Sequence, residues 1–315
     1  MKKIFQVLGL SVIFMLVLAA CGGGDNNEND NTGNTGGNNN GDGGIGEKDI
    51  ALGTDDYVSN TSNTYVAKLL LEDVGYNVDV NQTDVGVEWA GVSDGSTDAL
   101  VGAWLPHTHG SYWDEYGDNI EKIGTVTEEV ELGLAVPAYM EDINSIEDLT
   151  NNTSNVGEDL EWKITGISPG AGEMKLMESD VMPGYDLVDD WELVESSGAA
   201  MAASLSDAID KEEPIVVTLW TPHWTFNKFD LKILDDPKGK FGEPDDVVSV
   251  ATEGFKEASP LAYEVISQFQ ITKEQTQDIM LDIQNGMDAE EAAQKFLDEN
   301  PDFKDKVLEG IDIPE

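Results

Sequence analysis

The chain has few basic residues and almost no cysteine. Its 315 residues include 17 Lys+Arg against 63 Asp+Glu, which gives a formal net charge of −46 at pH 7. Nucleic-acid binding depends on clustered basic side chains that displace counterions, so this balance excludes a nucleic-acid partner. The single cysteine, Cys21, excludes an intramolecular disulfide. A high-salt habitat and general solubility explain the acidic composition equally well.

Motifs typical of common enzyme classes are also absent. The sequence has no HExxH motif, no glycine-rich nucleotide loop, no Ser-His-Asp signature and no candidate nucleophilic cysteine. These absences favour a protein that performs no covalent chemistry and carries no cofactor or metal. The only histidines are His107, His109 and His223. They leave one alternative open, a hydrolase with a three-histidine zinc site and a water in the fourth position.

The N-terminus predicts export and anchoring. Two lysines precede an almost unbroken apolar run, so residues 1–20 are typical of a secretory signal. The run ends in LAAC, which resembles the lipobox of a bacterial lipoprotein; Cys21 would then be lipidated and hold the protein on the extracytoplasmic face of the cell membrane. An ordinary signal peptide with a chance cysteine is the alternative. Residues 21–47 are rich in Gly, Asn and Asp and predict a flexible tether with a reach of about 25–30 Å.

The remaining residues exceed one comfortable core and predict two lobes. Apolar runs predict strands at 49–53, 76–80, 99–103, 133–137, 163–167, 191–194 and 215–219. Helical periodicity predicts helices at 61–74, 85–93, 172–179, 198–210, 261–269, 272–285, 289–299 and 302–309. Strands that alternate with helices indicate a parallel sheet in each α/β lobe. After about residue 246 the pattern is helical, and we expect these helices to pack back on the first lobe.

One motif, Trp-x-Pro-His, occurs twice. It starts at Trp104 in GAWLPHTHGSYW and at Trp220 in VVTLWTPHWTFN, and each time it directly follows a predicted strand. In open α/β sheets, ligands bind at this edge. Tryptophan is the best cation–π partner, and aromatic cages hold methylated ammonium groups, which cannot donate hydrogen bonds. Two matched tryptophans therefore favour a quaternary-ammonium site over core packing.

Four segments carry a specific resemblance. GAWLPHTH, KITGISPGAGEM, DDWELVESSGAAM and IVVTLWTPHW resemble the glycine betaine-binding proteins of osmoprotectant ABC importers, the OpuAC type. The resemblance covers residues 49 to about 270 and implies an α/β, two-lobed periplasmic-binding-protein-like fold of type II, with a hinge and a ligand cleft between the lobes. It implies a binding protein rather than an enzyme, which captures a small zwitterionic quaternary-ammonium ligand and delivers it to ABC transporter permease subunits. Some relatives have the lobes in the opposite chain order, so only local motifs are transferred.

The same resemblance implies the ligand-binding residues. Trp104 and Trp220 match two aromatics of the family's cage, and Tyr57 falls on the third, a tryptophan in some relatives. His109 matches a histidine that binds the ligand's carboxylate. Backbone N–H groups of the Gly172-Glu173 turn complete that subsite, in agreement with a helix start that attracts anions. We expect the Glu173 carboxylate to point away from the ligand.

The sequence thus predicts lobe I at 48–137 plus 246–315 and lobe II at 138–245. Glycine betaine is the favoured ligand; because a tyrosine replaces a tryptophan, proline betaine, carnitine or a sulfonium analogue is the alternative within the class. Outside it, the zinc hydrolase and a surface adhesin or scaffold remain as alternatives.

Overall fold

The computed structural model of the chain describes residues 46–314. The predicted signal at 1–20, Cys21 and most of the tether predicted for 21–47 lie outside these residues and stay predictions. Within the described range, every helix is too short or too polar to serve as a transmembrane span.

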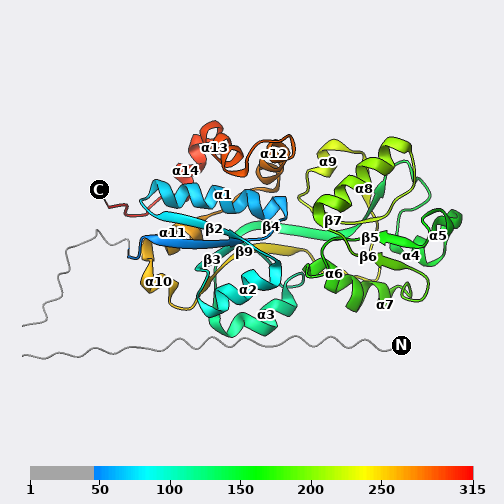
Figure 1. Ribbon diagram of the computed structural model, residues 1–315, viewed down its shortest axis with the longest axis horizontal. Helices are drawn as coiled ribbons and strands as arrows, with labels where there is room; N and C mark the ends of the chain where they lie inside the picture. The colour runs from blue at the N-terminus through cyan, green and yellow to red at the C-terminus, as the bar shows by residue number, and fades with distance from the viewer. Residues whose placement is uncertain (1–45, 315) are drawn as a thin grey trace, which may run out of the picture. The chain divides into compact units, whose positions relative to one another are not determined.

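A single mixed sheet of nine strands runs through residues 46–314 (Figure 1). Its order is β2-β1-β3-β9-β4-β7-β5-β6, and β8 pairs with β4 outside this path. The strands are β1 (Asp49–Thr54), β2 (Asn77–Gln82), β3 (Ala99–Leu105), β4 (Ile120–Pro137), β5 (Lys163–Thr165), β6 (Glu192–Val194), β7 (Val217–Thr221), β8 (Leu231–Ile233) and β9 (Asp245–Thr252). Together with the helices below they form two lobes, which confirms the predicted α/β class.

Each lobe contains three mutually parallel strands. These are β2, β1 and β3 in the first lobe and β6, β5 and β7 in the second. The prediction of parallel sheets is wrong for the rest, because β9 is antiparallel to β3 and β4, and β4 is antiparallel to β7 and β8. The expectation of helix after residue 246 is also wrong for β9. Almost every residue of β9 is buried, so the strand lacks the alternating pattern that marks a half-exposed one.

The long strand β4 passes from one lobe into the other. It pairs with β9 as far as Val130 and with β7 from Glu131 onward. The predicted boundaries, 48–137 plus 246–315 and 138–245, stay predictions; within the described residues the change of pairing partner lies between Val130 and Glu131.

Helices cover both faces of the sheet in each lobe (Figure 1). They are α1 (Val58–Asp73), α2 (Val85–Asp94), α3 (Gly110–Tyr116), α4 (Ile146–Thr150), α5 (Val156–Asp159), α6 (Gly172–Leu176), α7 (Met182–Gly184), α8 (Gly198–Lys211), α9 (Thr225–Lys228), α10 (Phe255–Ala258), α11 (Pro260–Gln268), α12 (Lys273–Gln284), α13 (Ala289–Glu299) and α14 (Pro301–Val307). Short 3₁₀ turns lie at η1 (Gly117–Asn119) and η2 (Thr153–Asn155), and a π-helical turn, η3 (Met177–Val181), joins α6 to α7.

The buried apolar residues of the described chain form four clusters. In the first lobe, Val101 of β3 packs in a core with α1, whereas its neighbour Leu100 packs on the opposite face with Trp89 of α2. This division follows from the alternation of side chains along a strand. The second lobe has a separate core that includes Ile164 of β5 and Tyr185.

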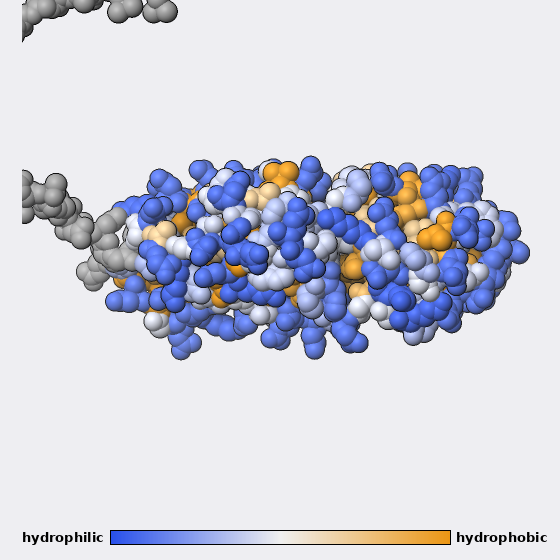
Figure 2. All heavy atoms as spheres, turned by 90° about the horizontal axis from the view of Figure 1, so that it is seen from below, coloured by the Kyte–Doolittle hydropathy of each residue, from blue (hydrophilic) through white to orange (hydrophobic). Residues whose placement is uncertain are grey.

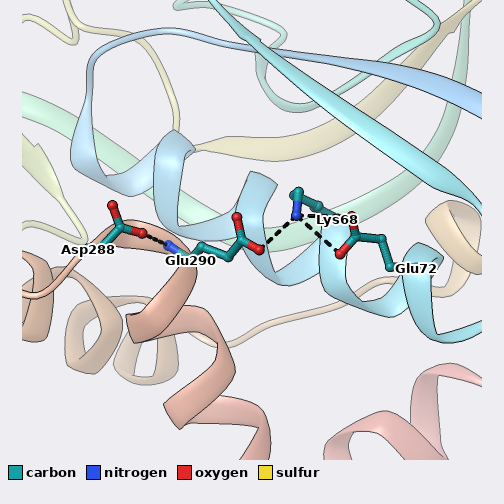
Figure 3. A network of polar contacts seen from close by, with 4 residues as sticks. All are labelled: Lys68, Glu72, Asp288 and Glu290. Carbon is teal, nitrogen blue, oxygen red and sulfur yellow. Dashed lines mark hydrogen bonds and ion pairs between the residues drawn. The ribbon is translucent and has the colours of Figure 1, made fainter.

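The C-terminal helices lie against α1. Lys68 of α1 bonds Glu290 of α13 at 2.9 Å and Glu72 of its own helix at 3.0 Å (Figure 3). Asp288 caps α13 by accepting a hydrogen bond from the Glu290 N–H at 2.9 Å. The Lys68–Glu290 contact joins two residues that are 222 positions apart in the sequence.

The surface carries little apolar material. The face in Figure 2 is mainly hydrophilic, with apolar atoms in small, separate patches. In the described part of the chain, the exposed large hydrophobic side chains are Val87, Tyr139, Val188 and Ile313. Of the aromatic side chains in the described residues, only Tyr139 is among these exposed ones.

Candidate ligand-binding site

A cavity between the two lobes brings together all six residues predicted to bind a ligand. It has an empty volume of about 370 Å³, at the lower end of the range for small-molecule sites. The predicted residues that line it are Tyr57, Trp104, His109, Gly172, Glu173 and Trp220. The structure thus places them in one site, and their roles toward a ligand remain a proposal.

Both Trp-x-Pro-His stretches lie at the carboxyl end of a central strand. Trp104 is the penultimate residue of β3 and pairs with Val247 of β9. Trp220 is the penultimate residue of β7 and pairs with Leu132 of β4. In each stretch the peptide bond before the proline is cis. Both tryptophans thus lie at the carboxyl end of a strand, as predicted, but each is the penultimate residue of its strand rather than the residue that follows it.

Three aromatic side chains from both lobes line the cavity. Trp104 and Trp220 are each 5% exposed, and Tyr57 precedes the first turn of α1. The centroids of the Tyr57 and Trp220 rings lie 5.3 Å apart, with an interplanar angle of 86°. The first lobe thus contributes Tyr57 and Trp104, and the second contributes Trp220.

His109 is held as a neutral hydrogen-bond donor. Its Nδ1 accepts a hydrogen bond from the Trp104 N–H at 3.0 Å. In a neutral imidazole with Nδ1 as acceptor, the proton lies on Nε2. Burial, and secondarily the charge of Lys175, lowers the His109 pKa to about 3, so the ring is uncharged at neutral pH.

The other two histidines, His107 and His223, do not line the cavity, and their hydrogen bonds are made within the protein. His223 Nδ1 lies 2.7 Å from the Thr225 hydroxyl, and burial lowers the His223 pKa to about 3. His107 is exposed, and its backbone N–H donates to Asp245 at 2.7 Å. Among residues 46–314, no group of three or more His, Cys, Asp or Glu side chains is placed to hold a metal ion. The three-histidine zinc alternative therefore has no counterpart in the described structure.

Gly172 lies at a close approach of the two lobes beside the cavity. A Cβ atom at this position would lie 2.0 Å from the carbonyl oxygen of Thr108. Only glycine allows this approach, because real Cβ contacts are never so short. Gly172 also begins α6, so its backbone N–H and that of Glu173 belong to the first turn of a helical segment.

Three buried polar atoms at the cavity lack a hydrogen-bond partner among the described residues. They are the Tyr57 hydroxyl and both carboxyl oxygens of Glu173. Burial raises the pKa of Glu173 well above its usual range, and the nearby N–H groups of Gly133 and Leu219 offset only part of that rise. Burial of the Glu173 side chain thus favours its protonated form. The expectation that the Glu173 carboxylate points away from the ligand stays a prediction; burial favours the uncharged form of the group, which repels an anion less.

Several polar residues of the site were missed from the sequence. Asp55 and Asn60 line the cavity beside Tyr57. Asp245 accepts hydrogen bonds from the Thr108 N–H at 2.8 Å and hydroxyl at 2.5 Å, and so fixes the turn before His109. Asp55 could have been found from the sequence, because it directly follows β1 and therefore lies at the carboxyl end of a strand, as Trp104 does in β3. Asp245 had none, because its partners lie 137 residues away.

The chain is similar to proteins of known families. Residues 48–299 match the OpuAC family model, described as the substrate binding domain of an ABC-type glycine betaine transport system. A curated relative, the glycine betaine/carnitine transport binding protein GbuC of Listeria monocytogenes, is 44% identical over 159 residues. That alignment covers 50% of this chain and 53% of the relative, so the chain spans about half the length of this curated relative.

Solved structures agree with the family model. Lactococcal OpuAC, closed and complexed with glycine betaine, is similar with a TM-score of 0.78 and 38% identity over 84% of this chain and 100% of that chain. The glycine betaine/L-proline-binding protein ProX of Borrelia burgdorferi gives a TM-score of 0.78 at 28% identity, over 85% of this chain and 97% of that one. A choline binding protein in complex with choline gives 0.77 at 25%, over 84% and 93%.

Proposed function

This chain belongs to the OpuAC family of substrate-binding domains of ABC-type glycine betaine transport systems, and we propose that it captures glycine betaine outside the cytoplasm and delivers it to an ABC importer. The observation that carries the proposal is the cavity in which aromatic faces from both lobes lie beside a neutral histidine donor. The proposed role is binding and release without covalent chemistry.

The aromatic residues would hold the trimethylammonium group. A quaternary ammonium cannot donate hydrogen bonds, and its attraction to each ring face contributes about 0.5–2 kcal/mol. Trp104 and Trp220 are almost fully buried, so these contacts are shielded from water. Salt therefore weakens them less than it weakens a surface ion pair.

The other end of the cavity would hold the carboxylate. His109 presents its Nε2–H, and the N–H groups of Gly172 and Glu173 lie at the start of α6. Burial favours the protonated form of the Glu173 side chain, which would not repel an anion there. Charge-assisted hydrogen bonds of this kind are stronger than neutral ones.

Ligand would bridge half-sites on the two lobes. Tyr57, Trp104 and His109 belong to the first, and Trp220 with the Gly172 turn belongs to the second. Ligand that contacts both half-sites favours the closed arrangement by differential binding. We propose lobes at 48–137 plus 246–315 and 138–245, with a hinge where the chain passes between them, and recognition of the closed form by permease subunits.

Membrane attachment is part of the proposal. The LAAC sequence supports lipidation of Cys21, and residues 21–47 would keep the binding body near its permease. Such a protein is held at the extracytoplasmic face of the cell membrane.

Calorimetric titration tests the proposal. The chain from residue 22 onward, without lipid, is titrated at high salt with glycine betaine, proline betaine, carnitine and choline. We expect micromolar binding of glycine betaine, which corresponds to about −8 kcal/mol, and much weaker choline binding, because choline lacks the carboxylate. Equal affinities would contradict the carboxylate subsite, a stronger response to proline betaine or carnitine would change the ligand, and no heat with any of them would refute the function.

A further inference from the structure

A buried carboxyl group, Asp55, lines the ligand cavity together with two of its aromatic residues. Asp55 directly follows β1 and is 1% exposed. Tyr57 and Trp104 line the same cavity. The side chain is thus enclosed in protein beside the space where a ligand would lie.

Hydrogen bonds tie Asp55 to both aromatic residues. Its Oδ1 accepts from the Tyr57 backbone N–H at 3.0 Å, and its Oδ2 accepts from the Asn60 amide at 2.7 Å. The Asn60 Oδ1 in turn accepts from the Trp104 indole N–H at 3.4 Å. One carboxyl group therefore lies at the centre of the bonds that orient two rings of the site.

In the described part of the chain, no cationic side chain pairs with this carboxyl group. The sequence contains no arginine, and none of the ion pairs formed within residues 46–314 includes Asp55. Its titratable neighbours are the exposed Asp56 and the buried Glu88 of α2, both acidic. An isolated buried carboxylate is costly, and a group in this position normally stays protonated or gains a cationic partner.

We propose that Asp55 is the counter-charge for the ligand's ammonium group, and that it releases its proton to solvent when that group enters the cavity. The inference rests on the proposed function, since it needs a ligand with a permanent positive charge. It extends that function, because the aromatic rings and the His109 subsite require no ionisable partner for the cation.

The pKa values of the groups at the cavity are consistent with a proton on Asp55 that can be released on binding. Burial raises the Asp55 pKa to about 7, against the lowering effect of its hydrogen bonds from Asn60 and Tyr57. Burial and the charge of Asp55 raise the pKa of Glu88 well above its usual range, which favours the neutral form of Glu88. Of the other titratable side chains that line the cavity, Tyr57 and His109 are uncharged near pH 7, and burial favours the neutral form of Glu173. Lys175 lies over the Tyr112 ring, and its charge contributes to lowering the pKa of His109.

The direction of the pH effect follows. A bound cation favours the ionised carboxyl group, so the pKa of Asp55 falls on binding. Affinity therefore increases as the pH rises toward 7 and levels off above it. If the pKa in the complex lies below about 5, affinity is about tenfold weaker at pH 6 than at pH 8. At pH 7, where half of the empty sites carry the proton, binding releases about half a proton per ligand.

Calorimetry in paired buffers measures this proton directly. Glycine betaine is titrated into the wild-type chain at pH 7 in phosphate and in Tris, whose ionisation enthalpies differ strongly. We expect the apparent enthalpies to differ by the value for about half a proton released, and the difference to shrink toward zero at pH 9. Betaine binding with no buffer dependence at pH 7 would overturn the inference and leave the proposed function intact. Absence of betaine binding would instead overturn the proposed function.

Two variants and one ligand analogue sharpen the assignment. Asp55→Asn should abolish the buffer dependence and flatten the affinity between pH 6 and pH 8, whereas Asp56→Asn removes the same formal charge one residue away and should retain both. Proton release that persists in Asp55→Asn would contradict the assignment, and wild-type proton release remains a sufficient test if that variant does not fold. The carbon isostere 3,3-dimethylbutanoate has the shape of glycine betaine without the positive charge. It should bind more weakly and release no proton; equal proton release with both ligands would refute the counter-charge.

Discussion

Tyr112 and Gly170 form a direct hydrogen bond between the two lobes. The Tyr112 hydroxyl on α3 donates to the Gly170 carbonyl at 2.6 Å, in the turn that precedes α6. Lys175 of α6 lies with its Nζ 3.4 Å from the centroid of the Tyr112 ring. These contacts lie beside the close approach of Thr108 and Gly172. They therefore stabilise the arrangement in which the lobes enclose the cavity.

Removal of this hydrogen bond should weaken ligand binding. For Tyr112→Phe we expect about a two- to twelvefold loss of affinity for glycine betaine, since a hydrogen bond contributes about 0.5–1.5 kcal/mol net. Calorimetry measures the loss. Tyr116→Phe on the same helix is the matched control, because its hydroxyl bonds Glu115 of that helix. An unchanged affinity in Tyr112→Phe, or an equal loss in both variants, would show that the contact does not stabilise closure.

Gly172 should tolerate no side chain. In Gly172→Ala the new Cβ would meet the Thr108 carbonyl oxygen at 2.0 Å, so the lobes cannot approach and affinity should fall by more than tenfold. Gly170→Ala is a close control, because its Cβ would have the Tyr112 hydroxyl as its nearest neighbour at 3.9 Å. Titration of both variants with glycine betaine decides the matter; similar affinities would contradict the steric argument.

Trp220 should supply binding free energy through its ring face. Trp220→Ala is expected to reduce affinity at least tenfold, or about 1.4 kcal/mol, whereas Trp220→Phe should retain part of the affinity because a smaller aromatic face remains. Fluorescence or calorimetric titration gives the ranking, and thermal unfolding verifies that each variant is folded. A Phe variant no better than the Ala variant would argue against a cation–π contact.

Glu173 should make the stability of the protein depend on pH. Its pKa is raised in the folded state, so the stability associated with its protonated form is complete below the unfolded pKa and is lost as the pH rises through the folded pKa. Glutamine resembles the protonated acid and lacks this loss. The melting temperature of Glu173→Gln should therefore exceed that of the wild type at pH 8 by more than it does at pH 4.5. A pH-independent difference would mean that Glu173 is ionised in the fold.

The order of the secondary structure could largely be predicted from the sequence. β1, α1, β2, α2 and β3 follow the predicted alternation closely, because each element carries its own periodic pattern. β9 could not be predicted in this way. It returns from the second lobe to lie between β3 and β4, and its partners are known only once those strands are placed.

The ligand-binding site, too, could be predicted only in part from the sequence. Trp104 and Trp220 carry a repeated local motif, and the six predicted residues line one cavity. The raised pKa of Glu173 and the position of Asp55 depend on burial by elements distant in sequence. Such environments have no local signature, since desolvation is a property of the folded chain.

The central claim is that aromatic residues of both lobes surround a methylated ammonium group. A crystal structure of the complex with glycine betaine tests it most directly. The account predicts that the ligand nitrogen lies within about 6 Å of the ring centroids of Tyr57, Trp104 and Trp220, the range of a cation–π contact. A ligand nitrogen that contacts the rings of only one lobe, or that lies outside this cavity, would contradict it.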